Sequence, residues 1–306
     1  MAPLASFGPG KVILLGEHSV VYGYPALAAP LSWGVTARAT PSRSCQLQLP
    51  PKLGKAGSIL LKAAFARAAE IFGRPKVRVA FESDLPTAVG LGSSAALSVA
   101  CSKLLLQASR RPESLEQVID AAGEMERVFH GNPSGIDHTC SADQRMILFR
   151  RSKGKERPQT DPVQCPKPLK ILVVVVGARP ATKTTVAALG ERSQRWPARY
   201  QRIFAEIGQL AAEGARAVEQ ADLEGLGDAM TVNQGLLTSL QLSSTNIHEM
   251  VRRLLKMGAL GAKLTGGGGD GGAVIGLFRE PEPTVAQLTR QGFQCFANQI
   301  AGPRAL

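Results

Sequence analysis

Six glycines fall within eight residues of this chain, in the segment TGGGGDGG at residues 265–272. Such a cluster marks a break between regular elements, and the apolar run AVIGLF after it predicts a strand. Gly266, Gly268 and Gly271 satisfy the G-x-G-x-x-G spacing of dinucleotide-binding folds. A dinucleotide-binding fold requires a helix directly after that loop, so the predicted strand excludes the Rossmann interpretation.

A second glycine-rich segment, GLGSSAALSV at residues 90–99, precedes apolar residues at helical spacing: Leu97, Cys101, Leu104 and Leu105. In one interpretation, Ser93 or Ser94 is simply the N-cap of this helix. In the other, the glycines let the backbone approach a phosphate, which the free N–H groups and the helix dipole hold. A serine hydroxyl in such a turn can also coordinate Mg²⁺. The segment alone leaves both interpretations open.

Length and composition indicate a folded protein with one large or two modest domains, since 44% of the 306 residues are hydrophobic. The composition shifts to Lys, Arg, Pro and Gly at residues 150–168, so we predict domains at 1–166 and 167–306. The longest apolar run, residues 171–176, is far shorter than the roughly 18 residues of a membrane span, and the first residues lack the apolar core of a signal peptide. We therefore expect a cytoplasmic protein that does not enter a membrane.

Charge and cysteine content exclude further classes. The net charge of +12 would suit nucleic acid or a small anion, but only three Tyr and two Trp accompany it. The basic segments RSKGKERP and ERSQRWPARYQR are typical of solvated loops and helix faces, so we expect no nucleic-acid partner. The five cysteines are scattered and form no C-x-x-C pair, which predicts neither a disulfide framework nor a zinc cluster.

The periodicity predicts a mixed α+β fold. Strands are expected at residues 11–16, 33–40, 45–50, 76–86, 171–176, 273–278 and 293–296. Helices are expected at residues 58–72, after the turn at 90–93, after residue 114, around 200–211, 236–240 and 247–255, and from about residue 284.

The helix after Ser114 carries a carboxylate on its apolar face. Glu126 follows Ile119 by one heptad and lies within about 20° of it on the helical wheel. A buried charge needs a cation, a metal or hydrogen bonds, so Glu126 is a candidate for a polar site. The alternative is an edge position from which the carboxylate reaches solvent.

The segment HGNPSGID at residues 130–137 is rich in turn formers and ends in an acid. If a helix begins there, its dipole keeps Asp137 ionised and able to accept a proton; a plain N-cap is the competing role. His130 and His138 do not indicate a metal pair, because no further ligand follows at a useful spacing.

Polar residues also stand beside the first predicted strand. Lys11 follows a Pro-Gly turn, whereas Glu17 and His18 come after the strand, where polar groups often line a site. Taken singly, each could equally be a surface residue. The Gly-Lys pairs of this chain continue with Val12, Ala56 and Glu156, so none forms a Walker A loop.

Four of these stretches, PGKVILLGEHSVVYG, GLGSSAA, HGNPSGID and KLTGGGGDGG, resemble the successive signatures of the GHMP small-molecule kinases. The resemblance covers nearly the whole chain, ARPATKTTVAALGER is similar to the family's Thr-Lys segment, and the first and third stretches are most similar to those of mevalonate kinases. The fold it implies joins a ribosomal-protein-S5-like N-terminal half to a ferredoxin-like C-terminal half. The implied reaction transfers a phosphoryl group from ATP to (R)-mevalonate, giving 5-phosphomevalonate.

The resemblance also implies a role for each matching residue. Asp137 would accept the proton of the substrate hydroxyl beside Lys11, Ser94 and Glu126 would bind Mg²⁺, and Glu17, His18 and Thr182 would line the mevalonate pocket. The ATP phosphates would contact two loops, made of Gly90, Leu91, Gly92, Ser93, Ser94, Ala95 and Ala96 and of Gly266, Gly267, Gly268 and Gly269. ATP and Mg²⁺ are thus the expected cofactors, mevalonate is the expected substrate, and a homodimer is allowed.

One departure from the family pattern keeps alternatives open. Asp270 interrupts the third glycine run, and Gly267 replaces its usual alanine. An acid near phosphates repels them unless it faces solvent, a cation or a backbone amide. Phosphomevalonate kinases carry an acid in a comparable loop and are the nearest alternative, whereas galactokinases differ after GEH. A ligand sensor without catalysis is a further alternative, although Lys11 and Asp137 are both present.

Overall fold

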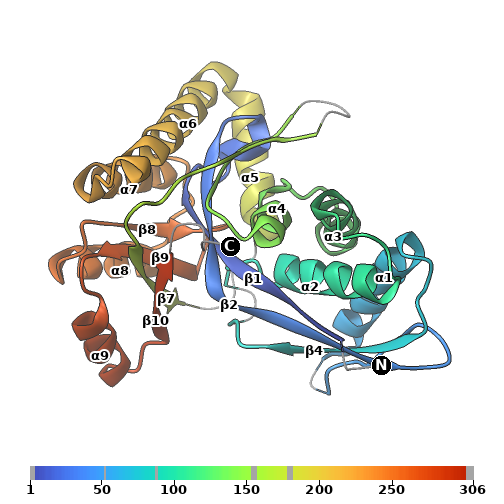
Figure 1. Cartoon of the computed structure of the whole chain (residues 1–306). Coiled ribbons are helices and arrows are strands. Elements are labelled where there is room, and N and C mark those ends of the chain that lie inside the picture. The colour runs from blue at the N-terminus through green and yellow to red at the C-terminus, as the bar shows by residue number, and fades with distance from the viewer. Residues whose placement is uncertain (1–3, 52, 87–88, 153–156, 178–181, 301–306) are drawn as a thin grey trace. The chain divides into compact units, whose positions relative to one another are not determined.

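A computed structural model describes residues 4–51, 53–86, 89–152, 157–177 and 182–300, with the backbone alone for residues 182–184. Runs of helices and runs of strands follow one another along the chain, and most strand pairs are antiparallel, which confirms the predicted α+β class (Figure 1). The strands are β1 Leu4–Leu15, β2 Ala26–Pro41, β3 Gln46–Leu47, β4 Val77–Ser83, β5 Ile147–Arg150, β6 Gln159–Pro162, β7 Leu169–Val176, β8 Gly261–Thr265, β9 Gly272–Phe278 and β10 Cys295–Ile300. The helices are η1 Ser19–Tyr22, α1 Lys55–Ile71, α2 Ser93–Ala108, α3 Leu115–His130, α4 Ile136–Asp143, α5 Thr182–Arg195, α6 Pro197–Glu219, α7 Leu223–Ser239, α8 Thr245–Lys256 and α9 Glu282–Arg290.

The chain forms two compact units that interleave along the sequence. One unit comprises Met1–Lys11, Trp33–Pro86 and Gly92–Gln144, and the other comprises Val12–Ser32, Thr87–Leu91 and Arg145–Leu306. Strands β1 and β2 contribute residues to both. The family-domain boundary near residue 166 stays a prediction, because these units follow packing and not family domains.

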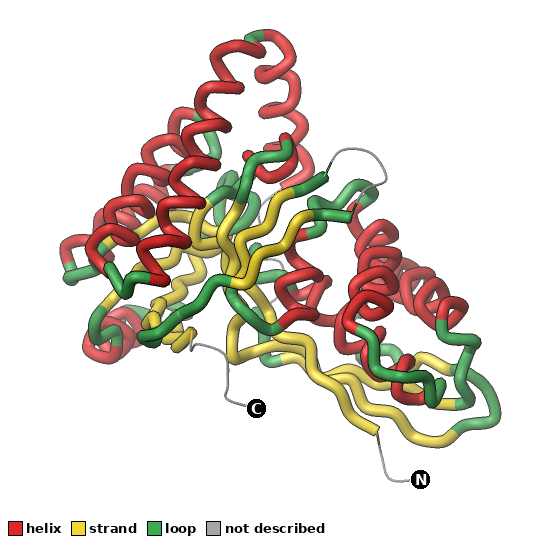
Figure 2. The backbone as a smooth tube through the Cα atoms, turned by 45° about the horizontal axis from the view of Figure 1, so that its top comes forward, coloured by secondary structure: helices red, strands yellow, loops and turns green. Residues whose placement is uncertain are grey.

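In the first unit, helices cover a small sheet. The second half of β2 pairs antiparallel with β4, and β3 lies parallel to β4. Helix α3 packs against α1, α2 and α4 (Figure 2). Its start at Ser114 was expected, and the Ser114 side chain caps it by accepting a hydrogen bond from Gln117 N. Gly8 lets β1 approach α2, because a Cβ at this position would lie 2.1 Å from Ala96 O.

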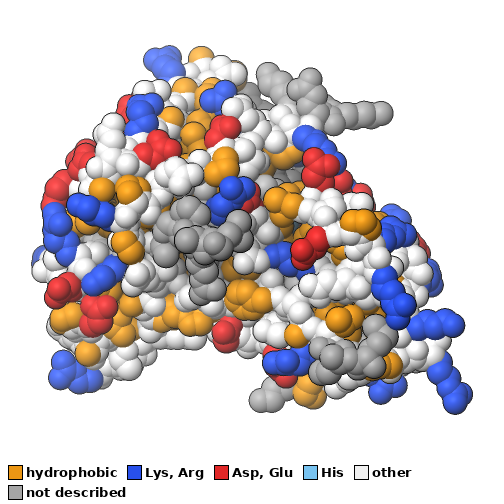
Figure 3. Space-filling view, viewed as in Figure 1, with side chains coloured by type: hydrophobic (Ala, Val, Ile, Leu, Met, Phe, Trp, Pro, Cys, Tyr) orange, Lys and Arg blue, Asp and Glu red, His pale blue; other side chains and the backbone are white. Residues whose placement is uncertain are grey.

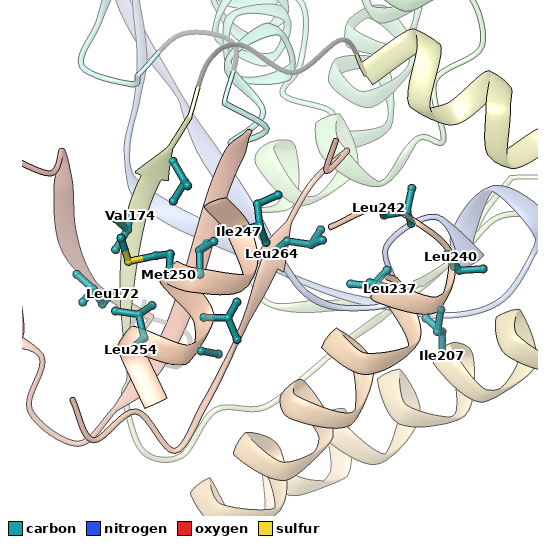
Figure 4. Packing of buried hydrophobic residues seen from close by; sticks show 14 of the residues in the cluster. Leu172, Val174, Ile207, Leu237, Leu240, Leu242, Ile247, Met250, Leu254 and Leu264 are labelled. Carbon is teal, nitrogen blue, oxygen red and sulfur yellow. The ribbon is translucent and has the colours of Figure 1, made fainter. Parts of the chain in front are cut away.

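The second unit is built on an antiparallel sheet in the order β10-β7-β9-β8. Counted along the chain, this is the order 4-1-3-2 of a βαββαβ arrangement, as the ferredoxin-like half requires. Its core lies between the sheet and the apolar stripes of α6, α7 and α8. Figure 4 shows Met250 and Leu254 of α8 against Leu172 and Val174 of β7.

The sequence analysis missed several elements, among them η1, β5, β6, α5 and β8. Strand β8 is fully buried but begins with Gly261 and carries Lys263 at its centre, so it lacks an apolar pattern. Strand β6 lies within the predicted connection at residues 150–168 and pairs with β5. Its sequence, QTDP, is mostly exposed, because an edge strand with one paired side needs little apolar surface.

Charged side chains of both signs occupy the surface, and the cysteines are free thiols. On the face seen in Figure 3, Lys and Arg side chains are scattered among Asp and Glu and do not form one block. All five cysteines are free thiols, and three are buried. Within the described part of the chain, every helix is too short or too polar to cross a membrane.

Candidate active site

An ion pair joins the lysine of β1 to the aspartate of α4. The Lys11 Nζ lies 3.2 Å from the Asp137 Oδ1, with the lysine side chain 3% exposed and the aspartate 35% exposed. Helix α4 begins where the turn formers predicted, and Asp137 lies in its first turn. The N-cap is Gly135, at a left-handed φ of 98°, so the interpretation of Asp137 as the N-cap is wrong. The carboxylate is instead free to face a ligand while the buried ammonium holds it.

Glu126 of α3 is buried, as its place on the apolar stripe predicted, and the solvent-reaching alternative is wrong. Ser94 Oγ donates a hydrogen bond to Glu126 Oε2, and Ser98 Oγ donates one to Oε1, each at 3.3 Å. Burial, together with the charge of Asp137, raises the pKa of Glu126 to about 7, although the two serines and Lys11 oppose this shift. A bound cation would relieve the cost of this buried charge.

Ser94 lies in the turn that opens α2. Gly92, with φ 74°, is the N-cap of this helix and no side chain caps it, so the N-cap interpretation of Ser93 or Ser94 is wrong. The Ser94 hydroxyl instead contacts Glu126 and lies 2.9 Å from the Nε2 of His130. Helix α2 therefore begins with backbone N–H groups that no side chain occupies, which is the arrangement that favours an anion.

The first glycine of this turn lies against the third glycine-rich loop. A Cβ on Gly90 would be 3.2 Å from Thr265 O and 3.4 Å from Gly266 Cα, so this close contact between the two segments favours glycine on both sides. Gly266, Gly268 and Gly269 all have positive φ. Two glycine segments far apart in the sequence thus meet, and Asp270 beside them is exposed to solvent.

His18 anchors the turn after β1 to the same loop. Its Nε2 lies 3.1 Å from Gly267 O, which can only accept, so the ring carries its proton on Nε2. Desolvation lowers the pKa of His18 to about 4, with Lys263 adding to the shift and the bond to Gly267 opposing it. The residue adopts φ 62°, which is uncommon for a side chain other than glycine. The neutral ring therefore offers Nδ1 as a hydrogen-bond acceptor.

The Glu17 side chain is fully buried, whereas a residue that lines a pocket is partly exposed. Its carboxylate pairs with the ammonium of Lys263, and both side chains are 0% exposed. Lys263 also donates to Leu264 O at 2.7 Å. The sequence analysis assigned no role to Lys263, although a lysine inside the short segment KLT before the glycine run was a signal of a buried partner. His130 and Ser98 were likewise not assigned to the site.

The remaining predicted residue, Thr182, begins α5, and its side chain lies outside the described residues. No group of three or more His, Cys, Asp or Glu side chains able to hold a metal is found in the described ranges. Ser94 and Glu126 place a hydroxyl oxygen and a carboxylate next to each other, where they could contact a cation.

Comparison with known proteins identifies the family. The profile of the GHMP kinases N terminal domain matches residues 59–144, and that of the GHMP kinases C terminal matches residues 215–293. A mevalonate kinase of Aeropyrum pernix is 34% identical and aligns with 96% of this chain and 94% of its own length. A mevalonate kinase of Pyrococcus horikoshii is 30% identical over 86% of this chain and 85% of its own length.

Solved structures give the same result. The crystal structure of L. major mevalonate kinase in complex with R-mevalonate matches with a TM-score of 0.86 at 25% identity, over 99% of this chain and 97% of that one. The Methanococcus jannaschii mevalonate kinase matches with a TM-score of 0.81 at 22% identity, over 98% and 99% of the two chains. The chain therefore belongs to the GHMP kinases and, within them, to the mevalonate kinase family.

Proposed function

We propose that this chain transfers the γ-phosphoryl group of ATP to the 5-hydroxyl of (R)-mevalonate, releasing ADP and 5-phosphomevalonate. Use of ATP follows from membership of the kinase family. The observation that carries the site assignment is the Lys11–Asp137 pair, in which a buried ammonium holds a carboxylate that solvent reaches.

Asp137 and Lys11 divide the chemistry at the acceptor oxygen. The Asp137 carboxylate accepts the hydroxyl proton as the oxygen attacks the γ-phosphorus, and the bond from that phosphorus to the leaving oxygen of ADP breaks. Lys11 holds the carboxylate in place and stabilises the negative charge on the transferring group. The site thus needs no covalent intermediate on the protein.

The two glycine loops are proposed to hold the ATP phosphates. The opening turn of α2 supplies unoccupied backbone N–H groups and the positive end of a 16-residue helix dipole. Gly266 lies against Gly90, and the run Gly266, Gly267, Gly268 and Gly269 offers a backbone without side chains, which phosphate oxygens can approach closely. Asp270 is exposed beside this run and so avoids direct repulsion.

Ser94 and Glu126 fit a magnesium ion. One hydroxyl and one carboxylate lie 3.3 Å apart, and Mg²⁺ is held by one or two such protein oxygens together with phosphates and water. The bound ion would neutralise charge on the phosphates. The buried Glu126 carboxylate accepts from two serine hydroxyls and lies 3.8 Å from His130 Nε2, and a bound cation would offset the cost of its burial.

The proposed mevalonate pocket includes His18 and Thr182. The Nδ1 of the neutral His18 ring accepts a hydrogen bond and therefore suits a substrate hydroxyl. For Glu17 we propose an indirect role: it fixes Lys263, and with it the strand that leads into the glycine loop.

A panel of acceptors tests the assignment. Mevalonate, phosphomevalonate, galactose and homoserine would each be supplied with Mg-ATP, and ADP release would be measured. We expect turnover with mevalonate alone. Turnover with phosphomevalonate alone would favour the alternative that Asp270 raises, and ATP binding without ADP release would favour a sensor.

A further inference from the structure

A cavity of about 300 Å³ lies in the second unit, beside Gly269 and Asp270. Helix α5 forms one wall, the connection from α7 to α8 forms another, and the end of the glycine loop closes it. Its lining is Thr185, Ala188, Arg192, Gln241, Leu242, Ser243, Ser244, Gly269 and Asp270. None of the roles proposed above uses Arg192, Ser243 or Ser244.

Arg192, Ser243 and Ser244 offer hydrogen-bond donors to this cavity. Arg192 gives one Nη2 proton to Leu240 O at 2.8 Å, while its Nε is buried and has no hydrogen-bond partner within the described residues. Ser243 Oγ accepts from Gln234 Nε2 at 3.0 Å, and Ser244 Oγ accepts from Ile247 N at 3.5 Å. Because both oxygens act as acceptors there, their own hydroxyl protons can serve a ligand. A buried guanidinium N–H without a partner is costly, and a ligand oxygen would remove that cost.

Charge and rigidity favour an anion in this cavity. Ser244 is also the N-cap of α8, a 12-residue helix whose positive end faces the same connection. The connection is held in place because Leu240 and Leu242 are fully buried in the core (Figure 4). The one carboxylate in the lining, Asp270, is exposed, so its repulsion is weakened by solvent.

We propose that this cavity is a second anion site, which takes a small phosphate-bearing molecule separately from ATP. Arg192 supplies the charge and the Nε donor, and the hydroxyls of Ser243 and Ser244 supply two further donors. The cavity is larger than a phosphate group and leaves room for a small organic remainder. Its ligand would act on the glycine loop directly, since Gly269 N donates to Leu242 O at 2.9 Å and Gly269 forms a bridge with Ser243.

Calorimetric titration with inorganic phosphate tests this proposal. The full chain is first saturated with Mg²⁺ and a non-hydrolysable ATP analogue, so that the main phosphate site is filled, and ionic strength is kept constant with chloride. We expect saturable binding that Arg192→Gln weakens about 10- to 100-fold, the value of a charge-assisted hydrogen bond. The matched control is Arg195→Gln on the same helix, whose guanidinium stacks on Trp196 outside the cavity, and it should change the Kd less than twofold.

Two further variants keep the test decisive if Arg192→Gln does not fold. Ala188→Leu adds bulk to the cavity while keeping Arg192 in the chain, and it should abolish phosphate binding. Asp270→Asn removes the only carboxylate of the lining and should tighten binding about 1.5- to 5-fold. The proposal is overturned if phosphate does not bind the analogue-saturated protein, or if Ala188→Leu binds it as well as the parent chain. A chain that binds phosphate here yet leaves mevalonate unphosphorylated would contradict the proposed function and not this site.

Discussion

This protein contains two ion pairs between a lysine and a carboxylate, and they differ in how far solvent reaches the carboxylate. Lys11–Asp137 belongs to the first unit and leaves its carboxylate 35% exposed, whereas Lys263–Glu17 belongs to the second unit and is fully buried on both sides. A carboxylate that solvent reaches can exchange a proton with a substrate. One enclosed by protein can only hold its partner in place. We therefore propose that exposure of the acid, and not the ion pair itself, distinguishes a catalytic pair from a positioning pair.

The largest effect should follow from Asp137→Asn. Removing a positioned proton acceptor lowers turnover about 10²- to 10⁴-fold, while the amide keeps the size of the side chain. We expect ATP affinity to stay within error of the parent chain in calorimetry, and the chain to stay folded with a lowered melting temperature, because the buried Lys11 ammonium loses its counter-charge. Unchanged turnover with mevalonate would show that the exposed pair is not the catalytic one.

Glu17→Gln should act on stability and not on the chemical step. It leaves the Lys263 ammonium buried without its counter-charge, which typically costs about 3–5 kcal/mol of unfolding free energy. Guanidinium titration measures this loss. The control is Glu82→Gln at the exposed Arg38–Glu82 pair, where the change should stay below about 1 kcal/mol.

A double variant extends the test of the buried pair. The double variant Glu17→Leu with Lys263→Met removes both charges of this pair, so much of the lost stability should return. If Glu17→Gln instead keeps full stability and raises the KM for mevalonate, Glu17 contacts the substrate directly and the buried pair is not its main role.

The sequence predicted the exposed pair better than the buried one, for a physical reason. Asp137 and Glu126 stand in local patterns, since turn formers announce the start of α4 and the helical wheel places Glu126 on the buried stripe. Glu17 and Lys263 are 246 positions apart, so their contact depends on tertiary folding alone. Strand β8 was missed because of the same lysine, whose charge is hidden only by its distant partner.

The contact between the glycine loops also depends on long-range packing. Both glycine clusters were evident in the sequence, and the family resemblance assigned them to phosphates. That Gly90 lies against Thr265 and Gly266 required the folded backbone. The cavity beside Gly269 combines residues from three elements, none of which carries a motif of its own.

A third carboxylate sharpens the comparison, because Glu126 is buried without a lysine of its own. Its pKa is 4.5 in the unfolded chain and about 7 in the folded protein. The folded state therefore favours the protonated acid, so stability is unaffected below pH 4.5 and falls as the pH rises from 4.5 through 7. Glu126→Gln removes this charge and should stabilise the fold at pH 8 by about 1–3 kcal/mol, with no gain near pH 4.5.

This prediction is measured by guanidinium titration at both pH values in the absence of metal. Glu124→Gln on the exposed side of the same helix is the control and should show no such dependence. The stabilised variant should also need more Mg²⁺ for half-maximal activity, since one proposed ligand is lost. A gain in stability with an unchanged Mg²⁺ titration would remove Glu126 from the metal site.

The smallest effect is expected at Asp270, an exposed carboxylate for which no ion pair is found in the described part of the chain. If a catalytic acid needs both solvent exposure and a lysine partner, an exposed acid without such a partner should contribute little to activity. Asp270→Gly restores a glycine run without a charge, and kcat/KM for ATP should change less than about twofold, as for most exposed substitutions. Steady-state kinetics at two salt concentrations measures this, because a direct effect of the charge on phosphates would weaken as salt rises. A collapse of ATP binding would mean that the acid takes part in the phosphate site, and exposure without a partner would then be sufficient for function.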